Sequence, residues 1–280
     1  MTHANSQQSA IASISGEVRT GADVIPIITF VNDAGAYAEM SRSFHTAGFD
    51  HARASFVALR SGGGVESDPY SAISSLIAEL AGPYFILCHQ DVRLDQGHRV
   101  EDFLRAIADV ERRDPLWAVA GNAGGLRTLT VVRCITDPTG GRTAHSLPAR
   151  VHSLDENFLV IRTRTGVRCS PQLSGFHFYG PDLCLNALAA GRRSYVIDFH
   201  LRHLSAGRRD ESYYAARERF LEHWRRDFRF CYVRTTLEVL FLSRWPLLRN
   251  VLGHPRLCKV LKNHFRVATV FGFVLGRRTT

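Results

Sequence analysis

The chain has 280 residues, of which 45% are hydrophobic and 22% are charged, and its formal net charge is +9. This composition fits one large folded domain, or one domain with an appendage. The excess charge lies near the C-terminus, where residues 225–280 hold 12 Lys and Arg against 2 Asp and Glu. The rest of the chain is nearly neutral, which excludes a uniformly basic nucleic-acid-binding protein.

The six cysteines form no Cys-x-x-Cys pair, and several lie inside apolar runs. This pattern indicates reduced core thiols in a cytoplasmic protein, not a zinc site or a set of disulfides. Residues 1–23 are mostly small and polar and lack a basic start followed by an apolar core, so we expect a loose leader and no secretory signal. We expect the main domain over residues 24–209 and a basic, amphipathic helical extension over 210–280.

In the first third of the chain, segments with the pattern of a β-strand alternate with segments that have the pattern of an α-helix. Strands are predicted over 25–31, 54–59 and 85–88, and helices over 37–47 and 69–81. This alternation is typical of a mostly parallel α/β sheet flanked by helices. Further along, we expect a surface helix from Val100, strands at 116–120, 158–161 and 195–199, and a hairpin or mobile loop over 126–150.

The apolar run Phe85–Cys88 ends abruptly at His89 and Asp91. Open α/β sheets bind ligands at the carboxyl ends of their strands. A carboxylate at such an end is a natural metal ligand beside a diphosphate, although Asp91 could equally begin a turn. By the same positional argument, Asn32 and Arg60 are candidate nucleotide contacts. The glycines at 62–64 match neither G-x-G-x-x-G nor the phosphate-loop pattern.

Several separate runs together resemble one known family. They are His89-Gln90-Asp91-Val92, Gly121-Asn122-Ala123-Gly124, Asp155-Glu156-Asn157-Phe158-Leu159, His177-Phe178-Tyr179-Gly180-Pro181-Asp182-Leu183-Cys184-Leu185 with Gly191, and His203-Leu204-Ser205-Ala206-Gly207. In order and spacing over residues 25–207, they resemble the family 2-like glycosyltransferases of bacteria, an HQDV-containing group with the GT-A fold. The Asp182 helix followed by the His-x-Ser-x-Gly end is the most specific part.

The resemblance implies an inverting transferase that uses a nucleotide-activated sugar, usually with a divalent cation, Mn²⁺ or Mg²⁺. Asp91 then matches the acid that holds the metal and the diphosphate, and His203 matches a histidine that faces them. The usual Asp-x-Asp motif is His89-Gln90-Asp91 here, so we expect Arg93 to supply part of the charge neutralisation.

Asp182 matches the general base of that family, with Pro181 in the place of its usual partner acid. A carboxylate in the first turn of a helix is also favoured by the helix dipole alone. Asp155 and Glu156 match the acceptor side, where His177 and Tyr179 are expected to line the pocket. For each of these residues a purely structural role is the alternative.

The expected function is therefore transfer of a sugar to a hydroxyl of a glycan or lipid-linked acceptor, as in the synthesis of cell-envelope polysaccharide in bacteria. The alternative is a non-catalytic nucleotide-sugar-binding or scaffold protein on the same fold. A nucleotidyltransferase is disfavoured because the first strand is not followed by a glycine-rich loop with lysine. The basic extension favours either a peripheral contact with the inner face of the cell membrane or a helical pair packed on the sheet.

Overall fold

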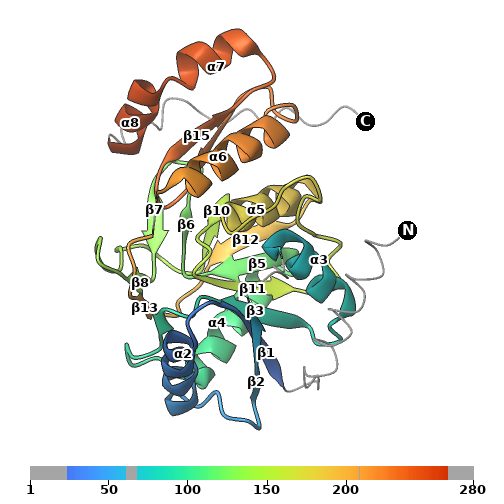
Figure 1. Cartoon of the computed structure of the whole chain (residues 1–280), viewed down its shortest axis with the longest axis vertical. Coiled ribbons are helices and arrows are strands. Elements are labelled where there is room, and N and C mark those ends of the chain that lie inside the picture. The colour runs from blue at the N-terminus through green and yellow to red at the C-terminus, as the bar shows by residue number, and fades with distance from the viewer. Residues whose placement is uncertain (1–23, 61–67, 208, 264–280) are drawn as a thin grey trace.

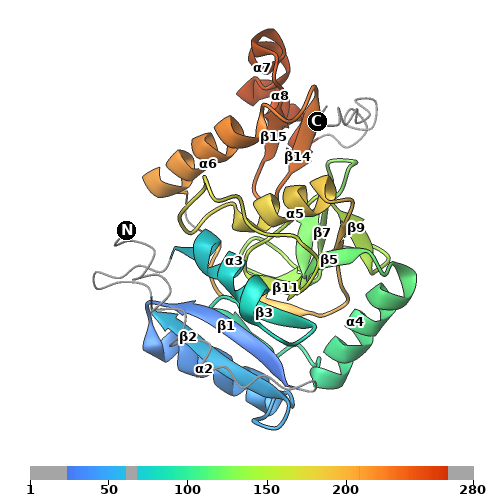
Figure 2. The same ribbon diagram turned by 90° about the vertical axis from the view of Figure 1, so that its right-hand side faces the viewer.

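The computed structural model describes residues 24–60, 68–207 and 209–263, with the side chains of residues 60 and 263 left out (Figure 1). The predicted leader, the glycine run at 62–64 and the apolar run at 267–276 lie outside the described residues. The remaining chain folds around one large sheet whose two faces are covered by helices (Figures 1 and 2).

The central sheet has seven strands in the order β2-β1-β3-β11-β5-β12-β9. Their bounds are β1 Ile25–Val31, β2 Ala54–Arg60, β3 Tyr84–Cys88, β5 Trp117–Gly121, β9 Ala149–Val151, β11 Phe158–Arg162 and β12 Arg193–Val196. Pairing is parallel from β2 to β3, whereas β11 is antiparallel to both β3 and β5, and β9 is antiparallel to β12. The expected α/β class, with a mostly parallel sheet flanked by helices, is confirmed.

Two apolar layers hold the helices on the sheet. The helices are α2 Ala34–Thr46, α3 Pro69–Glu79, α4 Val100–Arg113 and α5 Tyr179–Ala189. Alternate residues of β3 face opposite layers, so that Phe85 and Leu87 pack with α3 and α5 while Ile86 and Cys88 pack with α2 and α4. A strand buried on both faces requires a continuous apolar run, which is why β3 could be predicted from its sequence.

Local signals explain where the helices begin. The Asp33 side chain accepts hydrogen bonds from the backbone of Gly35 and Ala36 at the start of α2, and Asp68 caps α3 with Pro69 in its first turn. Carboxylate caps of this kind satisfy backbone N–H groups that have no partner inside the helix. The predicted helices over 37–47 and 69–81 therefore correspond to α2 and α3, with ends shifted by one to three residues.

Short strands build a second layer beside the sheet. Their bounds are β4 Val92–Arg93, β6 Ala123–Gly125, β7 Val131–Arg133, β8 Ile135–Thr136, β10 Ser153–Leu154 and β13 Leu201–His203. They form two three-stranded sheets, β10-β6-β7 and β4-β13-β8. The segment 126–150, expected as a hairpin or mobile loop, begins directly after β6 and contains β7 and β8, of which β7 pairs antiparallel with β6.

The C-terminal part differs from the expected all-helical extension. Helix α6 Glu211–Trp224 comes first, and an antiparallel hairpin of β14 Cys231–Arg234 and β15 Val239–Leu242 follows it. Helices α7 Pro246–Leu252 and α8 Pro255–Asn263 come last. Both β14 and β15 are fully buried, and α6 and the hairpin share the apolar layer of α3 and α5. The boundary expected at 209/210 thus does not separate two cores.

Within the part of the chain that the structure describes, no helix is both long and apolar enough to cross a membrane.

Candidate active site

A cavity of about 360 Å³ opens where β1 and β3 end. It is bordered by the second-layer strands, the start of α5 and the β14–β15 turn. Its lining residues are Phe30, Asn32, His89, Gln90, Asp91, Ala123, Arg133, Ile135, Asp137, Thr139, Asp155, Glu156, Asn157, Phe176, His177, Tyr179, His203, Ser205, Ala206, Gly207, Tyr213, Thr236 and Leu237. Seven of the predicted site residues are among them: Asn32, Asp91, Asp155, Glu156, His177, Tyr179 and His203.

The reversed direction of β11 brings distant sequence segments together in this cavity. Because β11 is antiparallel to β3, with Phe158 paired to Cys88, the residues before β11 meet those after β3. The backbone N–H of His89 donates to the Asn157 carbonyl at 2.9 Å. Asp155 and Glu156 therefore lie at the same edge of the sheet as His89 and Asp91.

A second antiparallel pairing places His203. Strand β13 pairs with β4 so that His203 is opposite Val92, and the Leu204 N–H donates to the Asp91 carbonyl at 3.0 Å. The His203 Nε2 then lies 3.2 Å from Asp91 Oδ1, and the rings of His89 and His203 are 5.8 Å apart. One ligand atom from each of these three residues lies within 4.8 Å of the other two. We call these residues the His-Asp-His cluster.

The three groups of the His-Asp-His cluster shift one another's ionisation. Burial opposes ionisation of Asp91, but the hydrogen bond and charge of His203 hold the pKa of Asp91 well below its usual range. Burial favours neutral His203 too, yet the hydrogen bond and charge of Asp91 raise the pKa of His203. Burial, followed by repulsion from His203, lowers the pKa of His89 to about 4. The Tyr179 hydroxyl lies 3.0 Å from His89 Nε2 and helps to orient that ring.

The donor atoms of this cluster suit a divalent transition metal. Two imidazoles and one carboxylate resemble the ligand sets of such metals, whereas Mg²⁺ prefers oxygen ligands throughout. The cluster borders an open cavity, which leaves room for further ligands from a substrate. Protons compete with the metal because bound imidazole must be neutral. These residues fit Mn²⁺ better than Mg²⁺.

Glu156 is the carboxylate best placed to move a proton. It lines the cavity, and its Oε1 accepts a hydrogen bond from the Gly180 N–H at 3.3 Å. Burial, with the neighbouring charge of Asp155, raises the pKa of Glu156 to about 8. Gly180 permits this contact, since a Cβ there would lie 2.7 Å from the Leu154 carbonyl oxygen. A carboxylate with a pKa near neutrality exchanges protons efficiently with a hydroxyl.

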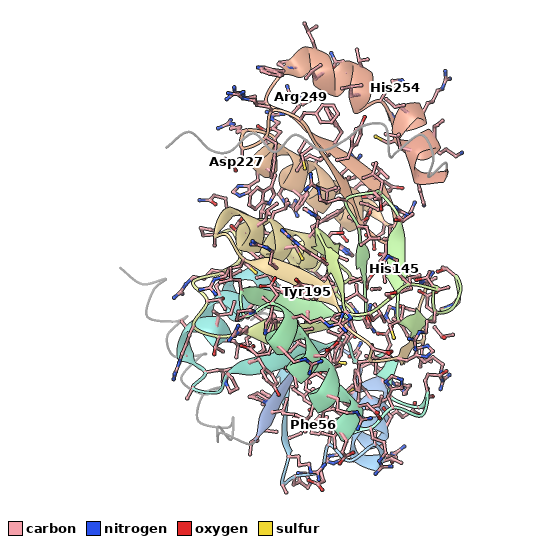
Figure 3. All side chains as sticks on the ribbon, turned by 180° about the vertical axis from the view of Figure 1, so that it is seen from behind. Phe56, His145, Tyr195, Asp227, Arg249 and His254 are labelled. Carbon is pink, nitrogen blue, oxygen red and sulfur yellow. The ribbon has the colours of Figure 1, made fainter. Side chains whose placement is uncertain are left out.

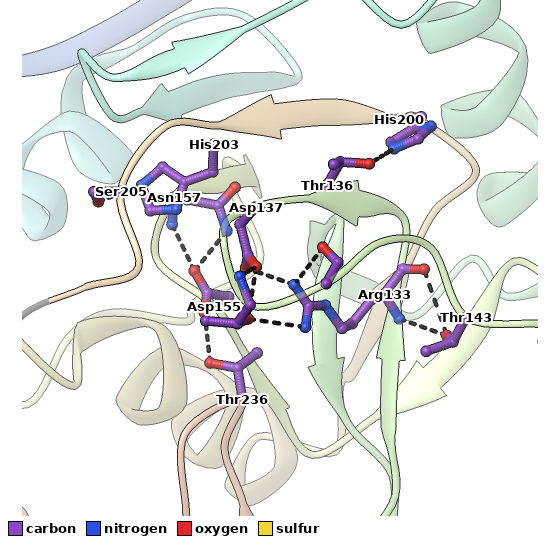
Figure 4. Close-up of polar contacts among 12 residues, drawn as sticks. Arg133, Thr136, Asp137, Thr143, Asp155, Asn157, His200, His203, Ser205 and Thr236 are labelled. Carbon is purple, nitrogen blue, oxygen red and sulfur yellow. Dashed lines mark hydrogen bonds and ion pairs between the residues drawn. The ribbon is translucent and has the colours of Figure 1, made fainter.

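Asp155 is held by its neighbours rather than left free. Its Oδ1 accepts from the Asn157 backbone N–H at 3.1 Å and from Asn157 Nδ2 at 2.5 Å (Figure 4). Its Oδ2 accepts from the Thr236 hydroxyl at 2.6 Å. Thr236 lies in the turn between β14 and β15, so the C-terminal hairpin contributes directly to the cavity wall. These bonds suit Asp155 to positioning more than to proton transfer.

The sequence did not single out an ion pair on the opposite wall. Arg133 Nη2 lies 2.5 Å from Asp137 Oδ2, and the Thr139 hydroxyl donates to Asp137 Oδ1 at 2.6 Å (Figure 4). All three residues line the cavity. They come from the polar segment after β6, where an Arg and an Asp four residues apart carry no specific signal. Tyr213 and Thr236 were missed for a different reason, because their segment was expected to lie in a separate extension.

Aromatic side chains form part of the cavity wall. Phe30 and Phe176 meet edge to face with ring centroids 5.9 Å apart, and His177 and Tyr213 do so at 5.5 Å. Burial lowers the pKa of His177. Flat apolar faces beside polar groups are suited to the stacking of a base or a sugar ring.

Asp182 does not fit the role of general base that was predicted for it. Its side chain is fully buried and does not line the cavity. Its two oxygens accept from Ser170 N–H at 2.8 Å, Ser170 Oγ at 2.7 Å and Trp224 Nε1 at 2.8 Å. Asn186 Nδ2 lies 3.2 Å from Oδ2 as a fourth donor. A carboxylate with four protein donors and no opening to the cavity cannot reach an acceptor hydroxyl.

Arg93 does not contribute its side chain to the cavity. Arg93 is buried beneath it, where its guanidinium donates to the carbonyls of Gln90 and Val92 and pairs with Glu39 at 2.7 Å. This disagrees with its predicted contact to the nucleotide, since the guanidinium is buried, lines no part of the cavity and is engaged with Gln90, Val92 and Glu39. The Arg60 side chain lies outside the described residues. Asn32 does line the cavity, and its backbone N–H donates to Gln90 Oε1 at 3.1 Å.

Comparison with solved structures gives only distant similarities. A mannosyltransferase from Pyrobaculum calidifontis, in complex with GDP-Man and Mn²⁺, is 10% identical, with a TM-score of 0.47 over 96% of this chain and 83% of the other. The A197 protein of STIV is 12% identical, with a TM-score of 0.38 over 62% of this chain and 80% of the other. Since both TM-scores are below 0.5, neither structure decides the activity.

Comparison of sequences gives a clearer result. No protein-family model matches the chain. A protein of Fuscovulum blasticum, described as ATP synthase subunits region ORF 6, is 36% identical over 210 residues, which cover 72% of this chain and 84% of that protein. That description states no activity, so the resemblance to family 2-like glycosyltransferases stays a prediction. The extent of the match shows that the chain belongs to the family of this ORF 6 protein.

Proposed function

We propose that the protein is an inverting glycosyltransferase, which moves a sugar from a nucleotide-activated donor to a hydroxyl of a glycan or lipid-linked acceptor. The observation that carries this proposal is the meeting, in one cavity, of the His-Asp-His cluster with the acid pair Asp155 and Glu156. A cation site and a proton acceptor on facing segments are what transfer from a nucleoside diphosphate sugar requires.

The charge of the cavity supports a cation-dependent donor. Among the described residues that line the cavity, the carboxylic acids are Asp91, Asp137, Asp155 and Glu156, and Arg133 is the one arginine. Arg133 is already paired with Asp137. A diphosphate entering this cavity would be repelled unless positive charge accompanied it. His89, Asp91 and His203 would hold a divalent cation, which when bound supplies charge that neutralises the diphosphate.

Other residues of the cavity are proposed to contact the nucleotide, the sugar and the acceptor. Asn32 lies at the end of β1, beside Gln90 and the His-Asp-His cluster, and is placed to contact the nucleotide. The aromatic pair Phe30 and Phe176 offers a stacking surface for a base or a sugar. His177 and Tyr213 border the side nearer Glu156 and are placed to contact the acceptor. Holding both substrates in one cavity replaces a bimolecular encounter by an oriented one.

Glu156 acts as the general base in this mechanism, in place of Asp182. The acceptor oxygen forms a bond to the anomeric carbon from the face opposite the diphosphate, so that configuration inverts. The bond from that carbon to the diphosphate oxygen breaks, and its electron pair leaves with the diphosphate. The hydroxyl proton passes to the Glu156 carboxylate. Asp182 holds α5 against α6 and the Ser170 segment, and so keeps Gly180 and Tyr179 in position.

Donor binding is the first test. Calorimetric titration with UDP, GDP, dTDP and CMP, each with and without Mn²⁺, should reveal one nucleotide whose binding requires Mn²⁺. Asp91→Ala should abolish that binding, whereas Asp109→Ala, which removes a carboxylate on α4 outside the cavity, should not. If none of the four nucleotides bound under either condition, the transferase proposal would fail.

Turnover separates an enzyme from a non-catalytic binding protein on the same scaffold. With the nucleotide identified, release of the nucleoside diphosphate from its sugar conjugates should be measured with an acceptor panel. Glu156→Gln should keep Mn²⁺-dependent nucleotide binding and lose release by about 10²–10⁴-fold. Binding without any release in the wild-type protein would favour the non-catalytic alternative.

A further inference from the structure

Helix α7 carries apolar residues on two adjoining faces, and the part of the chain that the structure describes covers only one of them. Leu248 and Leu252 pack against the cluster formed by Tyr232, Phe241 and neighbouring residues of the hairpin. Leu247 and Val251 are 79% and 66% exposed. Residues four apart share one face of a helix, so these two lie one above the other. Trp245, at the residue before the helix, is 46% exposed. We call Trp245, Leu247 and Val251 the α7 face.

Cationic side chains flank the α7 face in the sequence, and the segment that carries them contains no acidic residue. Residues 244–262 contain no Asp or Glu, and their five Lys and Arg residues are Arg244, Arg249, Arg256, Lys259 and Lys262. The Arg244 guanidinium lies over the Trp245 ring, 5.4 Å from its centroid. An exposed apolar surface flanked by cations is suited to binding an anionic lipid bilayer. The apolar side chains insert into the headgroup layer, and the cations pair with lipid phosphates.

Helix α8 connects this end of the molecule to the cavity wall. Helices α7 and α8 form one end of the molecule, with α2 at the opposite end (Figures 1 and 2), and Figure 3 shows Arg249 and His254 at that same end. The Lys262 ammonium of α8 donates to the Leu237 carbonyl at 2.6 Å. Leu237 lines the cavity. One end of α8 therefore supports the cavity wall, while the α7 face is exposed.

We propose that the α7 face, with the cations of residues 244–262, binds the surface of an anionic lipid bilayer. Helices of seven and nine residues lie on such a surface rather than cross it. This contact would hold the cavity next to the headgroup layer. The consequence that the acceptor is lipid-linked rests on the proposed transferase function, whereas the binding to lipid does not.

Vesicle flotation of the full chain tests this proposal. We choose vesicles of about 70% phosphatidylcholine and about 30% phosphatidylglycerol, which approximate a natural anionic membrane surface. We expect the protein to float with these vesicles and to stay at the bottom with vesicles of phosphatidylcholine alone. Raising the salt from about 0.1 M to about 0.5 M should weaken binding, because screening shortens the reach of the cations.

Substitutions locate the contact. The double change Leu247→Glu and Val251→Glu should weaken partitioning by roughly 30-fold or more, because it replaces two inserted apolar groups by carboxylates facing anionic lipid. The matched control is Leu104→Glu with Leu116→Glu, two exposed leucines on and after α4, which should bind like wild type. Arg249→Gln should weaken binding about fivefold.

Three results would overturn the proposal. They are absence of flotation with anionic vesicles, equal binding by the α7-face variant and the α4 control, and equal binding to neutral and anionic vesicles. A concentration-dependent dimer that the α7-face variant disrupts, without lipid binding, would assign the face to a second copy of the chain. Nucleotide binding in solution is measured in parallel, so that failure of the lipid contact and failure of the transferase proposal are told apart.

Discussion

Asp182→Asn separates a structural carboxylate from a catalytic one without knowledge of the substrate. The Asp182 oxygens accept from four donors that belong to three segments of the chain: Ser170, Asn186 on α5 and Trp224 on α6. An asparagine offers one acceptor oxygen and turns an NH₂ group toward the donors of the other oxygen. Two donors then lose their acceptor in a buried site.

The size of the effect follows from these bonds. Each buried donor left without an acceptor costs about 1–3 kcal/mol. Burial raises the pKa of Asp182, which means that the charged carboxylate is itself unfavourable at this buried position. Replacing it by a neutral amide therefore offsets part of the free energy lost with the hydrogen bonds. We expect a net destabilisation of about 3 kcal/mol, which corresponds to a fall of about 6–12 °C in the unfolding temperature for a chain of this size.

The assay is thermal unfolding followed by circular dichroism, with nucleotide binding measured on the folded variant. Trp224→Phe should also lower the unfolding temperature, since it removes one donor to Asp182 and replaces the buried indole by a smaller ring. Glu218→Gln is the control, an exposed carboxylate on α6 whose pairing with Arg217 contributes about 0–1 kcal/mol. An unfolding temperature within about 2 °C of wild type, together with a loss of turnover above about 100-fold, would restore Asp182 as the base.

The remaining predictions concern the cavity and its support. Turnover should rise about tenfold per pH unit below pH 8 and level off above it, because Glu156 must be ionised to accept a proton. Glu156→Gln should lack this rise. A rise that persists in the variant would contradict the assignment of Glu156 as the general base. Glu156 also affects the free energy of unfolding, because its pKa of about 8 in the folded protein exceeds the ordinary value of 4.5. The stabilisation that it contributes below pH 4.5 is therefore lost as the pH rises toward 8. Chemical denaturation of Glu156→Gln should not show this part of the decline. His203→Ala should weaken Mn²⁺-dependent nucleotide binding by about 10–100-fold in calorimetry, with binding of wild-type strength counting against the metal site. Gly125→Ala should lower the unfolding temperature strongly or prevent folding, since its Cβ would lie 1.7 Å from the Arg234 carbonyl oxygen. Gly141→Ala is the control and should change the unfolding temperature little, because its Cβ would lie 3.8 Å from the nearest atom, Thr136 Oγ1, and its backbone is not left-handed. Equal unfolding temperatures for the two variants would show that the hairpin does not pack on β6 as described.

The alternation of strands and helices in the first half of the chain was determined by local sequence. The continuous apolar run of β3 and the caps Asp33 and Asp68 extend over only a few residues, so neighbouring side chains suffice to predict them. The positions of His89 and Asp91 at the end of a buried strand follow from the same local pattern. The hairpin at 231–242 does not, because a short, wholly buried apolar run has no periodicity that distinguishes a strand from a helix.

The direction of β11 was decided by tertiary structure alone. A strand's sequence does not record whether its neighbours run parallel to it, yet that direction sets whether Asp155 and Glu156 lie beside His89 or at the opposite edge of the sheet. The orientation of Asp182 was decided in the same way. Its place in the first turn of α5 could be predicted, but the side of the helix that faces the cavity depends on how α5 packs against β10 and α6. The sequence by itself therefore determined which segments carry polar chemistry, whereas packing between distant segments determined which of those groups share a site.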